Sequence, residues 1–289
     1  MTDQVKGKTI VITGATSGIG LAAAKLFIEQ GASVIGVGRS DFKINQANDY
    51  LLSDTIAGQL IFFKGDLGSQ SQVSNLGKEI GNCIKQNFGE KLDVLVNNAG
   101  VYMQNKVITE DGIEYTFAVN HLASFLLSYA LMPLLLKADK GKIITISSYA
   151  HYNTPLCLKN IVNPHPYLGL LAYKQSKLCN VLFTRAINQM FDQISAVAVD
   201  PGLVNTEIGS KNGKGLSDWV WRHRRHQGIS PEDSAQAIVK LAFQSDNPKH
   251  NDHYFRRTQP KKPSKNAQND RLAKQLWHLS NLVTNIKWQ

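Results

Sequence analysis

The strongest constraint on the fold of this chain is a strict alternation of short apolar segments with segments of helical character. The apolar segments cover residues 8–13, 33–37, 60–63, 92–96, 142–146 and 195–199. The first of them, Lys8-Thr9-Ile10-Val11-Ile12-Thr13, is rich in β-branched residues, which is typical of a strand buried on both faces of a parallel sheet. Six strand–helix units in 289 residues predict a single α/β domain, a doubly wound Rossmann-like parallel sheet with helices on both faces.

A glycine-rich turn connects the first expected strand to a helix expected over residues 21–30. Its sequence is Gly14-Ala15-Thr16-Ser17-Gly18-Ile19-Gly20. Glycines at this place let the backbone turn tightly and approach a pyrophosphate, which accepts hydrogen bonds from the free N–H groups of the helix start. The position of the turn between a strand and a helix therefore predicts a dinucleotide-binding site.

The end of the second expected strand bears on which dinucleotide is bound. Folds that prefer NAD usually place an acidic residue here to bond the ribose 2′-hydroxyl, whereas this chain has Arg39. A guanidinium suits a 2′-phosphate, so the sequence favours NADP (NADPH). Asp41 is nearby and is a competing signal for NAD, and the alternative interpretation of Arg39 is an exposed loop residue.

Tyr173 and Lys177 are the best candidates for proton transfer. They are four residues apart, which places them on the same face of a helix. An ammonium beside a phenol favours the phenolate, so we expect Lys177 to lower the pKa of Tyr173 and make it a candidate general acid/base. Both residue types are common, and the alternative is a core tyrosine followed by a solvated lysine.

Polar residues at two further positions belong to the same pattern. Ser147 and Ser148 end the fifth apolar segment, and ligands bind beyond the carboxyl ends of the strands in this architecture. Asn120 lies in the apolar middle of a helix expected over residues 112–137, where a buried amide needs hydrogen-bond partners.

Together these motifs resemble the short-chain dehydrogenase/reductase family over essentially the whole chain. The matching motifs are T-G-x-x-x-G-x-G at 13–20, N-N-A-G at 97–100, Asn120, the serine pair, Y-x-x-x-K at 173–177 and P-G at 201–202. Residues 148–151, the helix 172–183 and the tail over residues 263–280 are similar to the retinol-dehydrogenase-like group of that family. That group often carries an N-terminal membrane anchor, and this sequence shows none.

The resemblance implies a role for each matching residue. Tyr173 would be the general acid in reduction and the base in oxidation, and Lys177 would bond the nicotinamide ribose. Ser148, with Ser147 as the second choice, would bond the carbonyl oxygen, and Asn120 would hold a water that links Lys177 to solvent. The implied cofactor-binding residues are Gly14, Ser17, Gly18, Ile19, Gly20, Arg39, Asp66, Asn98, Tyr173, Lys177, Pro201 and Thr206.

Two of these cofactor assignments have structural alternatives. Asp66 would bond the adenine amino group or only cap the next helix. Asn98 would contact the cofactor or only tie neighbouring loops through its amide. No metal site is expected.

These residues predict an NADP-dependent oxidoreductase that transfers hydride between nicotinamide and an apolar carbonyl or alcohol. The alternative is a non-catalytic NADP-binding sensor or interaction protein on the same fold. The helix that bears Tyr173 also resembles that of a light-driven double-bond reductase, but a corresponding large insertion is not found.

The chain divides into three expected parts. Residues 8–204 would form the nucleotide-binding and catalytic core, residues 205–230 a substrate lid, and residues 256–289 a C-terminal extension. The lid segment is aromatic and then basic, and its alternative is a surface helix whose tryptophans pack inward. Family members are often dimers or tetramers, so a homo-oligomer is a further possibility, although the extension could cover the surfaces they use.

Charge and cysteine content narrow the partners and the location. The formal net charge is +10, and residues 222–265 hold ten Lys/Arg against four Asp/Glu. A basic surface attracts anionic ligands, but without a nucleic-acid-binding motif we expect no nucleic-acid partner. Three cysteines and the lack of a signal peptide predict a cytoplasmic protein. The longest apolar runs are about seven residues, too short to span a bilayer, so we expect no integral membrane segment.

Overall fold

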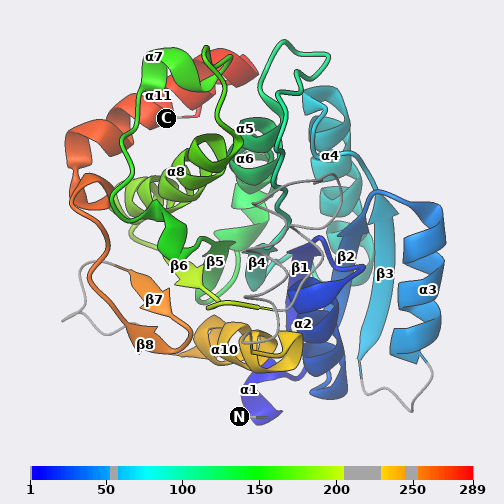
Figure 1. Ribbon diagram of the computed structural model, residues 1–289. Coiled ribbons are helices and arrows are strands. Elements are labelled where there is room, and N and C mark those ends of the chain that lie inside the picture. The colour runs from blue at the N-terminus through cyan, green and yellow to red at the C-terminus, as the bar shows by residue number, and fades with distance from the viewer. Residues whose placement is uncertain (1, 53–57, 205–228, 245–252, 289) are drawn as a thin grey trace.

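The computed structural model describes residues 2–52, 58–204, 229–244 and 253–288. At its centre is an eight-stranded sheet in the order β3-β2-β1-β4-β5-β6-β7-β8 (Figure 1). The strands are β1 Thr9–Thr13, β2 Ser33–Gly38, β3 Gln59–Lys64, β4 Val94–Asn97, β5 Gly141–Ile146, β6 Ile194–Asp200, β7 Tyr254–Arg256 and β8 Gln259–Pro260. All neighbours pair in parallel except β7 and β8. The predicted doubly wound parallel sheet is confirmed, and β7 and β8 extend it beyond the six expected strands.

Helices cover both faces of this sheet. They are α1 Thr2–Val5, α2 Gly18–Glu29, α3 Asp41–Leu52, α4 Gln70–Asn87, α5 Tyr115–Phe117, η1 Ala118–Leu122, α6 Ala123–Leu135, η2 Tyr149–His151, α7 Leu158–Ile161, α8 Gly169–Met190, α10 Pro231–Phe243, η4 Asn266–Gln268 and α11 Asp270–Thr284. The apolar residues of α2 and α10 belong to one hydrophobic cluster, and those of α4, α6, α8 and α11 belong to another. The sheet separates these two clusters.

Alternation along the strands explains why two cores form. In β1, Ile10 and Ile12 belong to the cluster with α2, whereas Val11 between them belongs to the cluster with α6. Successive side chains of a strand point to opposite faces, so a strand that is apolar at every position needs a cover on both. All five residues of β1 are buried, as this requires.

The order of the strands reverses beside β1. β1 pairs with β2 on one side and with β4 on the other, so the connections leave β1 and β4 in opposite directions across the sheet. Ligands of open α/β sheets bind at the carboxyl ends of the strands where the order reverses. In this protein that place lies beyond Thr13 and Asn97, the last residues of β1 and β4.

The C-terminal helix adds a further layer on the face covered by α8. Helix α11 contacts α8, and the two lie side by side in Figure 1. An aromatic cluster joins them: the ring centroids of Trp277 on α11 and Phe183 on α8 are 6.1 Å apart, and Phe125 of α6 lies 5.0 Å from Trp277. His121 is buried in the same cluster, and its Nε2 lies 2.9 Å from the Ser280 hydroxyl. The C-terminal segment is therefore part of the packed core.

The helix expected over residues 112–137 runs from Tyr115 to Leu135 and contains one π-helical turn, η1, around Asn120. This stretch of 21 residues is long and apolar enough to cross a membrane by length and composition alone. The expectation that the apolar segments are too short was wrong for this helix, because it counted only uninterrupted apolar runs. Small polar residues such as Ser124 and Ser128 interrupt these runs, but the helix as a whole is still apolar enough. Most of the stretch is buried inside the fold, as expected for the core helix of a globular domain.

Candidate active site

The glycine turn between β1 and α2 forms the floor of the site. Gly14 adopts a φ of +67°, a conformation that side chains disfavour. A Cβ on Gly20 would lie 2.3 Å from the carbonyl oxygen of Gly14, so any larger residue would push the turn open. Ser17 precedes α2 and its side chain makes no capping bond, which leaves the N–H groups of the helix start for another acceptor. The backbone of this turn fits the diphosphate of a dinucleotide.

Asn98 ties the end of β4 to this turn. Its Nδ2 donates to the carbonyl oxygens of Thr13, at 2.9 Å, and Gly14, at 3.3 Å. The Thr13 hydroxyl accepts hydrogen bonds from the N–H groups of Asn98 and Ala99, both at 3.0 Å. Asn98 therefore has the loop-tying role foreseen as its alternative. Thr13 is a supporting residue that the sequence analysis did not select, although it directly precedes the first glycine.

Arg39 is held at the end of β2 by a residue from a distant helix. Its Nη1 donates to the Tyr115 hydroxyl at 2.7 Å, and the Asp66 carboxylate lies close enough to influence the same phenol. Burial, followed by the charge of Asp66, raises the pKa of Tyr115. A Cβ on Gly68 would lie 2.5 Å from the Tyr115 ring, so Gly68 leaves the space that this ring occupies.

Two acidic residues near Arg39 are already engaged. Asp41 forms an ion pair with Lys64 at the end of β3. The carboxylate that could favour NAD is therefore already bound to a cation. Asp66 Oδ1 accepts the N–H of Gly68 at 2.8 Å. The idea that Asp66 caps the next helix was wrong, because α4 begins four residues later and Ser69 is its N-cap.

Tyr173 and Lys177 lie one turn apart on α8, and both are buried, with exposed fractions of 9% and 4%. Lys177 Nζ donates to the Ile146 carbonyl oxygen at 3.0 Å and lies 5.7 Å from the centroid of the Tyr173 ring. A Cβ on Gly100 would lie 3.3 Å from Nζ, so the N-N-A-G loop passes directly beside the ammonium. The predicted pair is therefore together, on the buried side of α8.

Burial dominates the proton affinity of this pair. It raises the pKa of Tyr173 to about 12, which a hydrogen bond with Ser148 offsets in part. It also lowers the pKa of Lys177 to about 8. The expectation that Lys177 lowers the pKa of Tyr173 was therefore wrong for the protein alone, because loss of solvent disfavours both charged forms.

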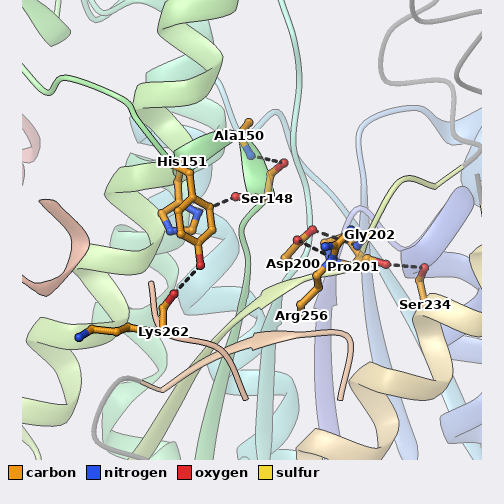
Figure 2. Close-up of polar contacts among 10 residues, drawn as sticks. Ser148, Ala150, His151, Asp200, Pro201, Gly202, Ser234, Arg256 and Lys262 are labelled. Atoms are coloured by element: carbon orange, nitrogen blue, oxygen red, sulfur yellow. Dashed lines mark hydrogen bonds and ion pairs between the residues drawn. The ribbon is translucent and has the colours of Figure 1, made fainter. Parts of the chain in front are cut away.

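The two serines at the end of β5 differ in their contacts. The Ser147 hydroxyl is buried and donates to the Lys177 carbonyl oxygen at 2.8 Å. The Ser148 hydroxyl accepts the Ala150 N–H at 3.1 Å and lies close enough to Tyr173 to lower the pKa of its phenol. The chain turns after Ser148 into η2 (Figure 2). Ser148 is therefore the serine that faces the phenol, as expected, and Ser147 fixes α8 to the sheet.

Asn120 uses its side chain to hold neighbouring segments. Its Nδ2 donates to the Val101 carbonyl oxygen at 3.0 Å and to the Ser176 hydroxyl at 2.9 Å, and its Oδ1 accepts the Val101 N–H at 2.7 Å. Both amide hydrogens and the amide oxygen are therefore used within the protein. The Ser124 hydroxyl reaches the backbone carbonyl oxygen of Asn120 at 3.5 Å.

The P-G motif closes the far side of the site. Asp200 Oδ1 accepts the Gly202 N–H at 3.0 Å, and the Ser234 hydroxyl donates to the Pro201 carbonyl oxygen at 3.2 Å (Figure 2). These bonds fix the turn after β6 against α10. Thr206 and nearly all of the expected lid lie outside the described residues.

Comparisons with known proteins agree with this arrangement. The sequence model of the short chain dehydrogenase family matches residues 8–216. Retinol dehydrogenase 12 of Mus musculus is 32% identical over 288 residues, which cover 99% of this chain and 89% of that protein. Polyprenol dehydrogenase of Mus musculus is 29% identical, over 94% of this chain and 82% of that protein.

Solved structures are similar over the same length. An uncharacterized protein from Mycobacterium paratuberculosis gives a TM-score of 0.74 at 28% identity, covering 98% of this chain and 96% of that one. A metagenomic short-chain oxidoreductase in complex with NADP gives a TM-score of 0.64 at 25% identity, covering 90% of this chain and 100% of that one.

Proposed function

This chain belongs to the short-chain dehydrogenase family, an NAD(P)-dependent oxidoreductase acting on CH–OH or C=O groups, and on that premise we propose that it uses NADP with an apolar carbonyl or alcohol. Tyr173 is the proposed general acid/base. The observation that carries this assignment is that Tyr173 and Lys177 lie one turn apart on the buried face of α8, with Lys177 Nζ 5.7 Å from the centroid of the Tyr173 ring. The family membership and the named dehydrogenases among its relatives speak against the alternative of a non-catalytic sensor.

The proposed division of labour follows from these contacts. The nicotinamide of the bound cofactor supplies or accepts the hydride. In reduction, Tyr173 donates its proton to the substrate oxygen, and Ser148 donates a hydrogen bond to the same atom. Burial holds Tyr173 as a phenol at neutral pH, which is the form a general acid requires. Lys177, between Tyr173 and the loop at Gly100, is the proposed source of the replacement proton.

The contacts of Arg39 support NADP as the preferred cofactor. Tyr115 holds the guanidinium at the end of β2, and Lys64 pairs with the nearby Asp41. A guanidinium that is held in place is suited to the 2′-phosphate of NADP. Asp41, the acidic residue that could bond the ribose 2′-hydroxyl of NAD, is already paired with Lys64. The NADP-bound oxidoreductase with a similar fold supports the same choice.

Replacing Arg39 by aspartate is expected to reverse this preference. A hydrogen bond to a charged group contributes about 1.5–3 kcal/mol, so NADPH affinity should fall roughly 10- to 100-fold while NADH affinity is kept or improved. Tyr115→Phe removes only the hydroxyl that holds the guanidinium and should give a smaller shift in the same direction. Fluorescence titrations with both nucleotides at one salt concentration measure the ratio, and an unchanged ratio in Arg39→Asp would refute the assignment.

Exposed apolar side chains support an apolar substrate. Tyr149, Leu168, Leu170 and Leu203 are 62%, 61%, 56% and 37% exposed. Each lies within five residues of Ser148, Tyr173 or Gly202 in the sequence, and these four side chains are the proposed apolar border of the substrate site. Retinol dehydrogenase 12 and polyprenol dehydrogenase, two of the relatives, are named for long apolar alcohols.

Kinetics with a graded series of substrates test this proposal. We expect kcat/KM with NADPH to rise along a series of aldehydes of increasing chain length that ends with retinal and a polyprenal. Small polar aldehydes of similar reactivity serve as the control. Equal kcat/KM across the series would exclude an apolar recognition site, and NADPH binding without turnover of any member would favour the sensor after all.

Residues 205–230 are proposed to form a lid over the substrate. Support comes from the described residues at the two ends of this segment. The Ile229 N–H donates to the Leu203 carbonyl oxygen at 2.8 Å, and Val204 forms a β-bridge with Ile229. The segment therefore leaves and rejoins the described fold at one place, directly after Gly202.

A reducing compartment, the cytoplasm, is the proposed location. Cys83, Cys157 and Cys179 are all free thiols, as expected where disulfides do not persist. Burial raises the pKa of the Cys179 thiol, so this cysteine is protected from reaction. Fractionation of cells that produce the protein tests the location, and recovery with the membrane pellet would contradict it.

A further inference from the structure

The loop that carries Ser148 is bonded to a segment more than a hundred residues later in the sequence. His151 lies at the centre of this connection and is completely buried. Its Nδ1 is 2.7 Å from the Ser148 carbonyl oxygen, and its Nε2 is 3.1 Å from the Ser264 backbone nitrogen. Figure 2 shows the imidazole beside Ser148 and the segment of Lys262. One side chain thus joins the serine of the active site to the C-terminal segment.

The two bonds define the protonation state of His151. The Ser264 N–H can only donate, so Nε2 must accept with its lone pair. Nδ1 then carries the hydrogen and donates it to the Ser148 carbonyl oxygen. Both nitrogens are used, in one tautomer of the neutral ring.

Two more bonds fasten the same two segments together. The Tyr152 hydroxyl donates to the Lys262 carbonyl oxygen, and Asn266 Nδ2 donates to the Thr154 carbonyl oxygen at 2.9 Å. The rings of Tyr152 and Tyr254 lie 4.2 Å and 4.8 Å from the imidazole, measured between centroids. Packing and hydrogen bonds therefore leave His151 little freedom to turn.

We propose that His151 is a positioning residue for catalysis: it couples residues 262–266 to Ser148 and so holds the Ser148 hydroxyl against Tyr173. The carbonyl that His151 binds and the hydroxyl that faces Tyr173 belong to the same residue. A rotation of the Ser148 peptide would move both, and small displacements of a catalytic group lower rates strongly. This inference rests on the proposed function, because it assumes that Ser148 bonds the substrate oxygen.

Acid should break this connection. A proton on Nε2 would place an N–H group against the Ser264 N–H, so the bond to the C-terminal segment would be lost. The ionisable groups that act on the ring are Tyr152 of its own loop, Asp200 of β6 and Tyr254 of β7. Arg256 of β7 pairs with Asp200 and so partly offsets the charge of that carboxylate. Asp200 favours the protonated ring, but burial outweighs it and lowers the pKa of His151. The two hydrogen bonds of the neutral His151 ring are thus present at neutral pH, and the bond to Ser264 is lost when acid protonates the ring.

Two substitutions that each keep one bond test the proposal. In His151→Asn the amide NH₂ replaces Nδ1 and keeps the bond to the Ser148 carbonyl. In His151→Gln the longer side chain places its amide oxygen near the position of Nε2, which keeps the bond to Ser264 and loses the one to Ser148. Asn266→Ala is the matched control, because it removes a bond between the same segments without touching Ser148 or His151. Each variant is studied as the full chain with NADPH and the best aldehyde substrate.

We expect kcat to fall roughly 10- to 100-fold in both His151→Gln and His151→Asn, because each variant breaks the connection at one end, while kcat of Asn266→Ala is unchanged. The NADPH dissociation constant should stay constant throughout. The decrease of kcat that the wild type shows at acid pH should disappear in His151→Asn and His151→Gln, because neither side chain can be protonated there.

Two further outcomes would overturn the proposal. A melting temperature far below that of Asn266→Ala and a weakened NADPH affinity in both His151 variants, with kcat falling in proportion, would mean that His151 acts only through the fold. A wild-type kcat in both variants would mean that Ser148 needs no such support. Ser148→Ala separates this inference from the proposed function: if that variant keeps full activity, the assignment of Ser148 itself fails.

Discussion

Tyr173→Phe is expected to lower kcat by about 10²–10⁴-fold, the usual contribution of a general acid or base, and to leave NADPH binding close to the wild type. The substitution removes one hydroxyl from a buried ring and keeps its packing against Tyr102, whose ring centroid lies 6.0 Å away. Ser148 would keep its bond to the Ala150 N–H, so the loop has no reason to move. The loss should therefore appear in the chemical step.

Single-turnover kinetics and nucleotide titration measure these two effects separately. Tyr129→Phe is a suitable control, because Tyr129 is a half-exposed phenol on α6 that packs against Trp288. Its kcat should equal that of the wild type. Substantial activity of Tyr173→Phe would remove Tyr173 from the proton-transfer step, and a parallel loss of NADPH binding would point to a structural role.

The pH dependence of the two reaction directions should differ. Burial raises the pKa of Tyr173 to about 12, so the phenol that reduction needs is present at all pH values below that. Oxidation needs the phenolate, whose fraction increases with pH until the pKa is reached. We therefore expect alcohol oxidation to accelerate from pH 7 to pH 10, whereas reduction should slow above about pH 8, where Lys177 loses the proton that it passes to Tyr173.

The second large effect is a loss of stability in weak acid, caused by His121. The Ser280 hydroxyl donates its hydrogen to the Leu276 carbonyl oxygen at 2.8 Å, so it accepts from His121 Nε2–H. Among the described residues, His121 Nδ1 has no hydrogen-bond partner, and the rings of Phe117, Phe125 and Phe183 surround the imidazole. A charge on this ring would be buried without compensation.

The direction of the effect follows from the two pKa values. Burial lowers the pKa of His121 from 6.5 to about 3 in the folded state. Between these values the unfolded chain binds the proton and the folded protein does not, so acid favours unfolding. The stability is fully present above pH 6.5 and falls by about 1.4 kcal/mol per pH unit below it. The free energy of unfolding should thus be on the order of 2 kcal/mol lower at pH 5 than at pH 7.

Urea unfolding at a series of pH values measures this slope, and His121→Leu identifies its source. Leucine has no proton to bind, so the variant should lose much less stability between pH 7 and pH 5 than the wild type. A remainder with the same sign is expected from His151, whose pKa burial also lowers. If His121→Leu keeps the full slope, the acid sensitivity comes from other groups.

Patterns along the chain predicted the central sheet, because period and composition are local properties. The six apolar segments became β1 to β6, and the glycine turn lies where a strand–turn–helix pattern places it. β7 and β8 were missed because they have three and two residues, of which several are charged or polar. Such strands exist only because β6 offers an edge to pair with.

The parts of the site that could not be predicted arise between distant segments. Tyr115 meets Arg39 across 76 residues, and His151 meets Ser264 across 113, and no spacing rule links such pairs. The pKa of Tyr173 was misjudged for a related reason. The spacing to Lys177 is visible in the sequence, but burial depends on everything packed around α8.

The apolar stretch from Tyr115 to Leu135 has a consequence for recovery after unfolding. When the fold opens, this segment has no Asp, Glu, Lys or Arg side chain that would keep it separate in water, and it can associate with the same segment of another chain. Association depends on concentration, whereas refolding of one chain does not. Inactivation by heat should therefore depend on the rate of unfolding and association and not on an equilibrium between folded and unfolded protein. The fraction of enzyme recovered on cooling should decrease as the protein concentration increases.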